Sequence, residues 1–129
     1  MKLLIDTHAL LWWAFNDVDR LSTTALRALA DRANDVLVSS ASAWEIATKF
    51  RIGKLPEARA FIEDFAGVVA RAGAEHLPTL WTHALAAGLL PGPHRDPFDR
   101  LLAAQAKIEN ARVVSADPVF AHYGVPVIW

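Results

Sequence analysis

The stretch Leu3-Leu4-Ile5-Asp6-Thr7 begins with three apolar residues and then changes abruptly to a carboxylate and a hydroxyl. A short apolar run that is bounded by polar residues is typical of a strand buried on both faces. Burying a carboxylate at the end of such a strand costs free energy unless the charge is paired or takes part in function. We therefore expect a buried strand over residues 3–5, and we interpret Asp6 as a functional residue rather than a structural one.

Apolar runs and helical patterns alternate along the rest of the chain. Further strands are expected at residues 35–39, 75–77, 112–115 and 125–129. Helices are expected at residues 8–15, 22–33, 42–52, 56–72, 80–88 and 96–110, with Ser22 as the N-cap of the second and a glycine closing the fifth. Strands that alternate with helices predict an α/β fold, in which a parallel sheet is covered by helices on both faces.

Composition and length limit what the protein can be. The chain has 129 residues, so a single domain over residues 1–129 is expected. Its net charge of -1 argues against binding nucleic acid by overall charge, although a local basic patch stays open. It has no cysteine, which excludes disulfides, thiolate zinc sites and cysteine nucleophiles. Without a long apolar run or a signal-peptide pattern, we expect a soluble cytoplasmic protein with no membrane partner.

Acidic residues recur at the ends of the expected elements. Asp6 and Asp117 follow strands, Glu45 lies in the first turn of a helix, and Asp96 and Asp99 flank a helix start. Ligand sites of open parallel sheets form at the carboxyl ends of the strands, so these groups could converge there. Converging carboxylates raise each other's pKa, and a divalent cation such as Mg²⁺, which prefers oxygen ligands, removes that penalty. The pattern indicates metal-assisted hydrolysis.

Most of these acids also have an ordinary structural interpretation. Glu45 could complete a capping box that starts at Ser42, and Asp96 could be a helix N-cap. Asp99 could complement the dipole of that helix, and Asp117 could start a turn. Residue types and spacing alone leave both interpretations open.

Four segments that contain these acids follow one another in a recognisable order. They are LIDTHALLW at residues 4–12, SSASAWEIA at 39–47, HRDPFDRLLAAQA at 94–106 and VVSADPVF at 113–120. Together they resemble the four motifs of PIN-domain ribonucleases, and the resemblance extends over nearly the whole chain. A short chain of this kind is similar to the VapC-type toxins of bacterial toxin–antitoxin pairs.

This resemblance implies a PIN-like (Rossmann-like) α/β/α sandwich with a central, mostly parallel sheet and a Mg²⁺- or Mn²⁺-dependent endoribonuclease site. It assigns Asp6, Glu45 and Asp99 to a core acidic triad and Asp117 to a fourth, more variable acidic position. Asp6 and Asp99 are the implied metal ligands. The resemblance also implies an RNA substrate, a homodimer and a small cognate antitoxin whose C-terminal segment occupies the active-site groove.

Several neighbours of the acids are candidates for supporting roles. The polar candidates beside the carboxylates are Thr7, Asp96 and Ser115, with Asp96 interpreted as a helix cap first and a metal ligand second. The candidate RNA-binding cations are Lys49, Arg51, Arg95 and Arg100, and His94 is a candidate substrate contact. Lys49 stands four residues after Glu45, so a helical ion pair between the two is the competing interpretation.

Two other functions remain open from the sequence. One is a catalytically inactive PIN-fold binding module, and the other is an acidic-site phosphohydrolase that acts on DNA. The intact acidic positions argue against the inactive module, because a purely structural domain has no need of clustered like charges.

Overall fold

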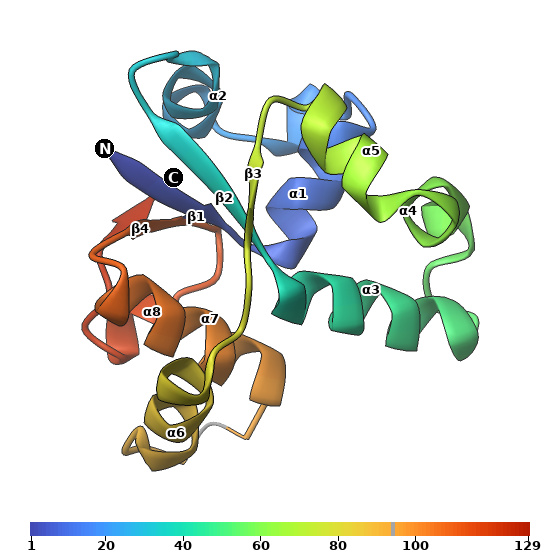
Figure 1. Cartoon of the computed structure of the whole chain (residues 1–129). Coiled ribbons are helices and arrows are strands. Elements are labelled where there is room, and N and C mark those ends of the chain that lie inside the picture. The colour runs from blue at the N-terminus through green and yellow to red at the C-terminus, as the bar shows by residue number, and fades with distance from the viewer. Residues whose placement is uncertain (94) are drawn as a thin grey trace.

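A five-stranded sheet forms the centre of the protein in the computed structural model, which describes residues 1–93 and 95–129 (Figure 1). The strands are β1 (Lys2–Ile5), β2 (Asp35–Ser39), β3 (Glu75–Leu77), β4 (Arg112–Val114) and β5 (Val127–Ile128). Their order is β3-β2-β1-β4-β5, and all four pairings are parallel, which confirms the predicted sheet. The chain moves outward from β1 in one direction through β2 and in the other through β4. The crevice between the ends of β1 and β4 is therefore the topological switch point, where ligands bind in such sheets.

Helices cover both faces of this sheet. They are α1 (Thr7–Ala14), α2 (Thr23–Ala30), α3 (Ser40–Arg51), α4 (Arg59–Glu63), α5 (Phe65–Arg71), α6 (Trp81–Leu89), α7 (Pro97–Ile108) and α8 (Val119–His122), with short 3₁₀ turns η1 (Val18–Arg20) and η2 (Pro56–Ala58). Side chains of β1 alternate between two cores: Leu3 and Ile5 pack in one core, and Leu4 packs in the other with α7 and α8. Figure 1 shows α7 and α8 on one side of the sheet and α1, α2 and α5 on the other. The α/β sandwich is confirmed.

The prediction of a single helix over residues 56–72 is wrong, because the helix is interrupted at Asp64 and forms two helices, α4 and α5. The backbone of Asp64 is extended (φ −153°), and its carboxylate accepts a hydrogen bond from the Gly67 N–H at 3.0 Å. This side chain therefore caps α5 instead of continuing α4. A Cβ atom on Gly67 would lie 2.0 Å from the Asp64 carboxylate, so the cap needs glycine at that position.

Two other predicted helix ends are also wrong. Helix α3 begins at Ser40, two residues before the predicted start, because the Ser39 hydroxyl accepts a hydrogen bond from the Ala41 N–H and caps the helix. Ser42 therefore lies inside the helix, and the capping box with Glu45 is not formed. Helix α6 runs through Gly88 to Leu89 and so is not closed by that glycine. Helix α8 and the turn η1 were not predicted at all, because each is too short for a periodic pattern.

None of the helices in the described part of the chain has the length and apolar character that a membrane span requires.

Candidate active site

Asp6 occupies the carboxyl end of the central strand, where β1 passes into α1. Its backbone N–H still donates to the Val114 carbonyl of β4, at 3.1 Å. Its carboxylate caps α1, because Oδ1 accepts a hydrogen bond from the Ala9 N–H at 2.8 Å. The other oxygen, Oδ2, accepts a hydrogen bond from the Ser115 hydroxyl. Both oxygens are thus oriented by the fold, and the residue is only 7% exposed.

Burial raises the pKa of Asp6 above its usual range. The hydrogen bonds from Ser115 and from the Ala9 N–H act in the opposite direction, as does the charge of His8. The negative charge of Glu45 raises the pKa further, so Asp6 and Glu45 lie close enough to repel each other. A divalent cation at this carboxylate would further favour its charged form.

Ser115 connects Asp6 to the loop after β4. Its hydroxyl donates to Asp6 and accepts a hydrogen bond from the Asp117 N–H at 3.0 Å. Asp117 itself is exposed, and its Oδ1 accepts a hydrogen bond from the Val119 N–H at 2.9 Å, at the start of α8. Asp6 and Asp117 line the same pocket, of about 350 Å³. The structure therefore brings these two predicted acids together at the switch point of the sheet.

Glu45 reaches the site from α3. It is buried, and its Oε2 lies 2.6 Å from the Lys49 ammonium, one helical turn later. The ion-pair interpretation of Lys49 is thereby confirmed. The buried Thr7 hydroxyl donates to the Ser42 hydroxyl at 3.0 Å, which joins the first turn of α1 to α3. This contact holds the helix that carries Glu45 beside the helix that Asp6 caps.

The two acids of the third motif have different positions. Asp96 is the N-cap of α7, and its Oδ1 accepts hydrogen bonds from the N–H groups of Phe98 (2.9 Å) and Asp99 (3.3 Å). The predicted cap is confirmed. Asp99 lies in the first turn of α7 and is half-buried, and the described lining of the pocket that holds Asp6 includes neither Asp99 nor Glu45.

No three His, Asp or Glu side chains in residues 1–93 and 95–129 lie close enough together to hold a metal ion as a group. Mg²⁺ differs from zinc or calcium in this respect, because it is commonly held by one or two carboxylates together with waters and substrate phosphate. The carboxylate donors around Asp6 therefore fit Mg²⁺ or Mn²⁺ by their chemistry. Asp6 in particular is a buried carboxylate that a cation would stabilise in its charged form.

The cations predicted to contact RNA are placed very differently from one another. Arg51 and Arg95 are exposed, whereas Lys49 forms an ion pair with Glu45. Arg100 donates from Nε to the Ala87 carbonyl at 3.1 Å and from its terminal nitrogen to the Leu90 carbonyl. This arginine thus binds the C-terminal carbonyls of α6, which gives it a structural role that the sequence did not reveal. The predicted contact His94 lies outside the described residues.

His8 and Trp12 line the acidic pocket, and the interpretation of the sequence missed both. His8 is exposed in the first turn of α1, and its ring centroid lies 6.0 Å from that of Trp12. The available signal was position: His8 stands two residues after Asp6 at the same sheet edge, and Trp12 stands one helical turn further on. These side chains give the acidic pocket one aromatic wall.

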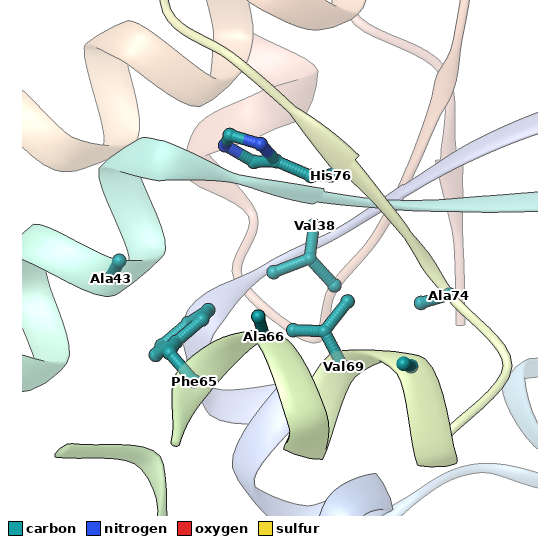
Figure 2. Close-up of a pocket in the computed structure, with 8 residues that line it drawn as sticks. Val38, Ala43, Phe65, Ala66, Val69, Ala74 and His76 are labelled. Carbon is teal, nitrogen blue, oxygen red and sulfur yellow. The ribbon is translucent and has the colours of Figure 1, made fainter. Parts of the chain in front are cut away.

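A second pocket, of about 400 Å³, lies between β2, β3 and α5 and contains no carboxylate. Figure 2 shows Val38 and Val69 pointing toward one another there, with Phe65 and Ala66 beside them on α5. Among the described residues that line it, His76 alone has a polar side chain, and its ring nitrogen lies 2.7 Å from the Ser40 hydroxyl. This pocket offers none of the chemistry that the acids at the switch point supply.

Comparison with known proteins identifies the family. The structure is similar to those of VapBC2 from Rickettsia felis bound to a promoter DNA fragment (17% identity, TM-score 0.65, 98% of this chain and 97% of the other) and FitAcB from Neisseria gonorrhoeae (18%, 0.62, 97% and 95%). It is also similar to VapBC-1 from nontypeable Haemophilus influenzae (14%, 0.60, 98% and 96%). At these identities the likeness shows a shared fold. No curated protein matches the sequence. The family model for the PIN domain matches residues 3–126, so the chain belongs to the PIN domain family.

Proposed function

We propose that this protein is a Mg²⁺- or Mn²⁺-dependent endoribonuclease and the toxin of a toxin–antitoxin pair. The observation that carries the proposal is the buried Asp6 carboxylate at the switch point of the sheet, oriented by Ser115 and close to the charges of Glu45 and Asp117. Its two hydrogen bonds do not fully offset the cost of burying the charge, because the pKa of Asp6 stays raised, and a bound cation would lower that cost. Membership of a family whose members are typically nucleases supports the same conclusion.

Asp6 and Asp99 are the carboxylates that we propose as metal ligands. When bound, the ion would lower the pKa of a water molecule and neutralise charge on the scissile phosphate. Ser115 and the Ala9 N–H hold the Asp6 carboxylate in one orientation.

Glu45 and Asp117 are then the groups that orient the attacking water and accept its proton. Lys49 fixes one oxygen of Glu45 and so limits the directions in which that carboxylate can point. The water oxygen forms a bond to phosphorus, the bond from phosphorus to the 3′ oxygen breaks, and that oxygen takes up a proton. The products carry a 5′-phosphate and a 3′-hydroxyl.

The partners follow from the same proposal. The similar structures named VapBC and FitAcB support a cognate antitoxin, whose C-terminal segment would occupy the groove at Asp6. Of the predicted RNA-binding cations, the exposed Arg51 and Arg95 are the ones we propose to contact the RNA backbone. We further propose that the toxin is a homodimer and acts in the cytoplasm.

The proposal is tested by incubating antitoxin-free protein with total cellular RNA in Mg²⁺, in Mn²⁺ and in EDTA. We expect discrete fragments with either metal and none in EDTA. Asp6→Asn keeps the size of the side chain and removes its charge, so this variant should not cleave. Asp64→Asn is the matched control, because Asp64 also caps a helix but lies outside the site. Undiminished cleavage by folded Asp6→Asn, or cleavage in EDTA, would overturn the assignment.

A further inference from the structure

Two aromatic side chains of α1 line the acidic pocket. His8 and Trp12 stand four residues apart, so they lie on the same face of the helix, one turn from each other. Their ring centroids are 6.0 Å apart, and the ring planes are inclined by 36°. Both rings line the pocket of about 350 Å³ that also contains Asp6 and Asp117. One cavity therefore combines carboxylates with aromatic rings.

The fold holds these rings in place. Trp12 is half-buried and packs against the core on one side of the sheet. Its ring also contacts that of Trp129, which follows β5, with the two centroids 6.1 Å apart. At the other end of this row of rings, the Asp6 carboxylate caps α1 and so fixes the turn that carries His8. A rigid aromatic surface binds a ligand at a low cost in conformational entropy.

His8 is the ring of this wall that solvent reaches. It is exposed, and within residues 1–93 and 95–129 it makes no hydrogen bond. It nevertheless lies near the acids, because its charge lowers the pKa of Asp6. The fold thus places an imidazole beside the carboxylate without using its polar atoms. A side chain in this position is available to a ligand.

The opposite side of the pocket comes from the loop between β4 and α8. Ala116 and Asp117 line the pocket there, and both are exposed. The Ser115 hydroxyl donates to Asp6 and accepts from the Asp117 N–H, so this loop is fixed relative to the same carboxylate. Ala116 has only a methyl side chain, which leaves room between the loop and α1 for a flat group.

A nucleotide has both of the chemical features that this pocket addresses. Nucleobases stack on aromatic side chains and on histidine, and such stacking tolerates every base because each has a π face. The phosphate of the same nucleotide is one sugar away from the base, and a cation held by Asp6 would bind that phosphate. Inorganic phosphate would leave the rings without a contact, and a purely apolar ligand would cover the carboxylates without pairing them. The combination therefore favours a nucleotide.

We propose that His8 and Trp12 form a nucleobase subsite, on which the base next to the scissile phosphate stacks. The identification of this base as part of an RNA substrate rests on the proposed function. The two rings bind the nucleotide so that its phosphate faces Asp6, and they take no part in proton transfer. Because stacking tolerates every base, the subsite contributes to affinity more than to the choice of sequence.

Binding is tested in the Asp6→Asn protein in EDTA, so that RNA is bound without being cut. The two probes are a short oligoadenylate and a ribose-phosphate backbone of the same length without bases, which carry the same phosphate charge. We expect the oligoadenylate to bind at least about 5-fold more tightly, which is the lower end of the range for one stacked base. Equal dissociation constants, or no measurable binding of either probe, would overturn the proposal.

Substitutions of His8 separate stacking from charge. His8→Ala should remove most of the preference for the oligoadenylate, whereas His8→Phe keeps a ring, loses the ionisable group and should retain the preference. His122→Ala changes another exposed histidine, outside the lining of this pocket, and is the matched control. Because both histidines are exposed, all three variants should fold. A preference that is unchanged in His8→Ala, or lost equally in His8→Phe, would overturn the proposal.

Cleavage kinetics give a second readout at the intact site. With Mn²⁺ and an RNA that the wild type cuts, Trp12→Leu should raise KM about 5-fold or more and change kcat little, because stacking is the same before and during the reaction. Trp13→Leu is the matched control, since Trp13 is also half-buried on α1 but is not among the described residues that line the pocket. Thermal unfolding checks that each variant is folded.

The two assays distinguish failure of the subsite from failure of the nuclease. A KM that is unchanged in both His8→Ala and Trp12→Leu would overturn the subsite and leave the nuclease standing. A preference for the oligoadenylate that depends on His8, in a protein whose wild type cuts no RNA, would support the subsite and overturn the nuclease instead.

Discussion

Replacing Asp6 by asparagine should make the metal-free protein more stable while it abolishes cleavage. The variant keeps the N-cap, because asparagine caps about as well as aspartate. It also keeps a hydrogen bond to Ser115, since the amide can donate where the carboxylate accepted. What it removes is a buried negative charge whose pKa is raised by burial and by Glu45.

The magnitude follows from three opposing contributions. Burial of an ionised carboxylate costs several kcal/mol. Against this, the charge interacts favourably with the α1 dipole by up to about 1 kcal/mol, and it strengthens the Ser115 hydrogen bond by about 1–1.5 kcal/mol. The net gain for Asp6→Asn is about 1–2 kcal/mol, which raises Tm by about 3–10 °C in a chain of this size.

The stability gained by Asp6→Asn should increase with pH. Because the folded pKa of Asp6 lies above the unfolded value near 4, the native state binds more protons between the two values. Wild-type stability therefore falls as pH rises through this window, and the advantage of Asp6→Asn grows with it.

Thermal unfolding in EDTA, recorded from about pH 4 upward, measures the difference in Tm between Asp6→Asn and the wild type. The exposed-cap control Asp64→Asn should show no such gain. Saturating Mn²⁺ should stabilise the wild type and not Asp6→Asn. A lower Tm for Asp6→Asn at neutral pH, or a gain that does not change with pH, would refute this account of the site.

Three further substitutions test contacts that position the site, each by chemical denaturation. Phe120→Ala should cost about 3–5 kcal/mol, because Phe120 is fully buried in the core between the sheet and α7; an unchanged midpoint would contradict that packing. Lys49→Met leaves the buried Glu45 without its ion pair and should cost about 1–3 kcal/mol in the metal-free protein; a stabilised variant would show that the pair is not needed. Gln105→Leu should also cost about 1–3 kcal/mol, since the buried Gln105 accepts a hydrogen bond from Ser39, and a neutral effect would argue against that contact.

The features that could be predicted from the sequence are those set by neighbouring residues. The run from Leu3 to Ile5 followed by Asp6 defines both a buried strand and its polar end. The Glu45–Lys49 pair follows from helical spacing, and the cap at Asp96 follows from the proline after it. Such local patterns determine most elements and place the acids at element ends.

The remaining features depend on contacts between distant residues. The roles of Ser39 and Asp64 as helix caps depend on one hydrogen bond each, which the hydrophobic pattern does not contain. Arg100 binds the Ala87 carbonyl, 13 residues earlier, and this contact exists only because α6 packs on α7. The position of Asp99 relative to Asp6 depends on how α7 packs against the sheet. The convergence of the four acids therefore stays a prediction, although pairs that include Asp6 are brought together.

The assignment of a metal-dependent ribonuclease is tested by comparing the cleavage of an RNA and a DNA of identical sequence, chosen around a site cut in total RNA. We predict that the wild-type protein with Mn²⁺ cuts the RNA, leaves 5′-phosphate ends, and does not cut the DNA. EDTA should abolish the cut. Equal or preferential cleavage of the DNA, or RNA cleavage that persists in EDTA, would contradict a metal-dependent ribonuclease centred on Asp6.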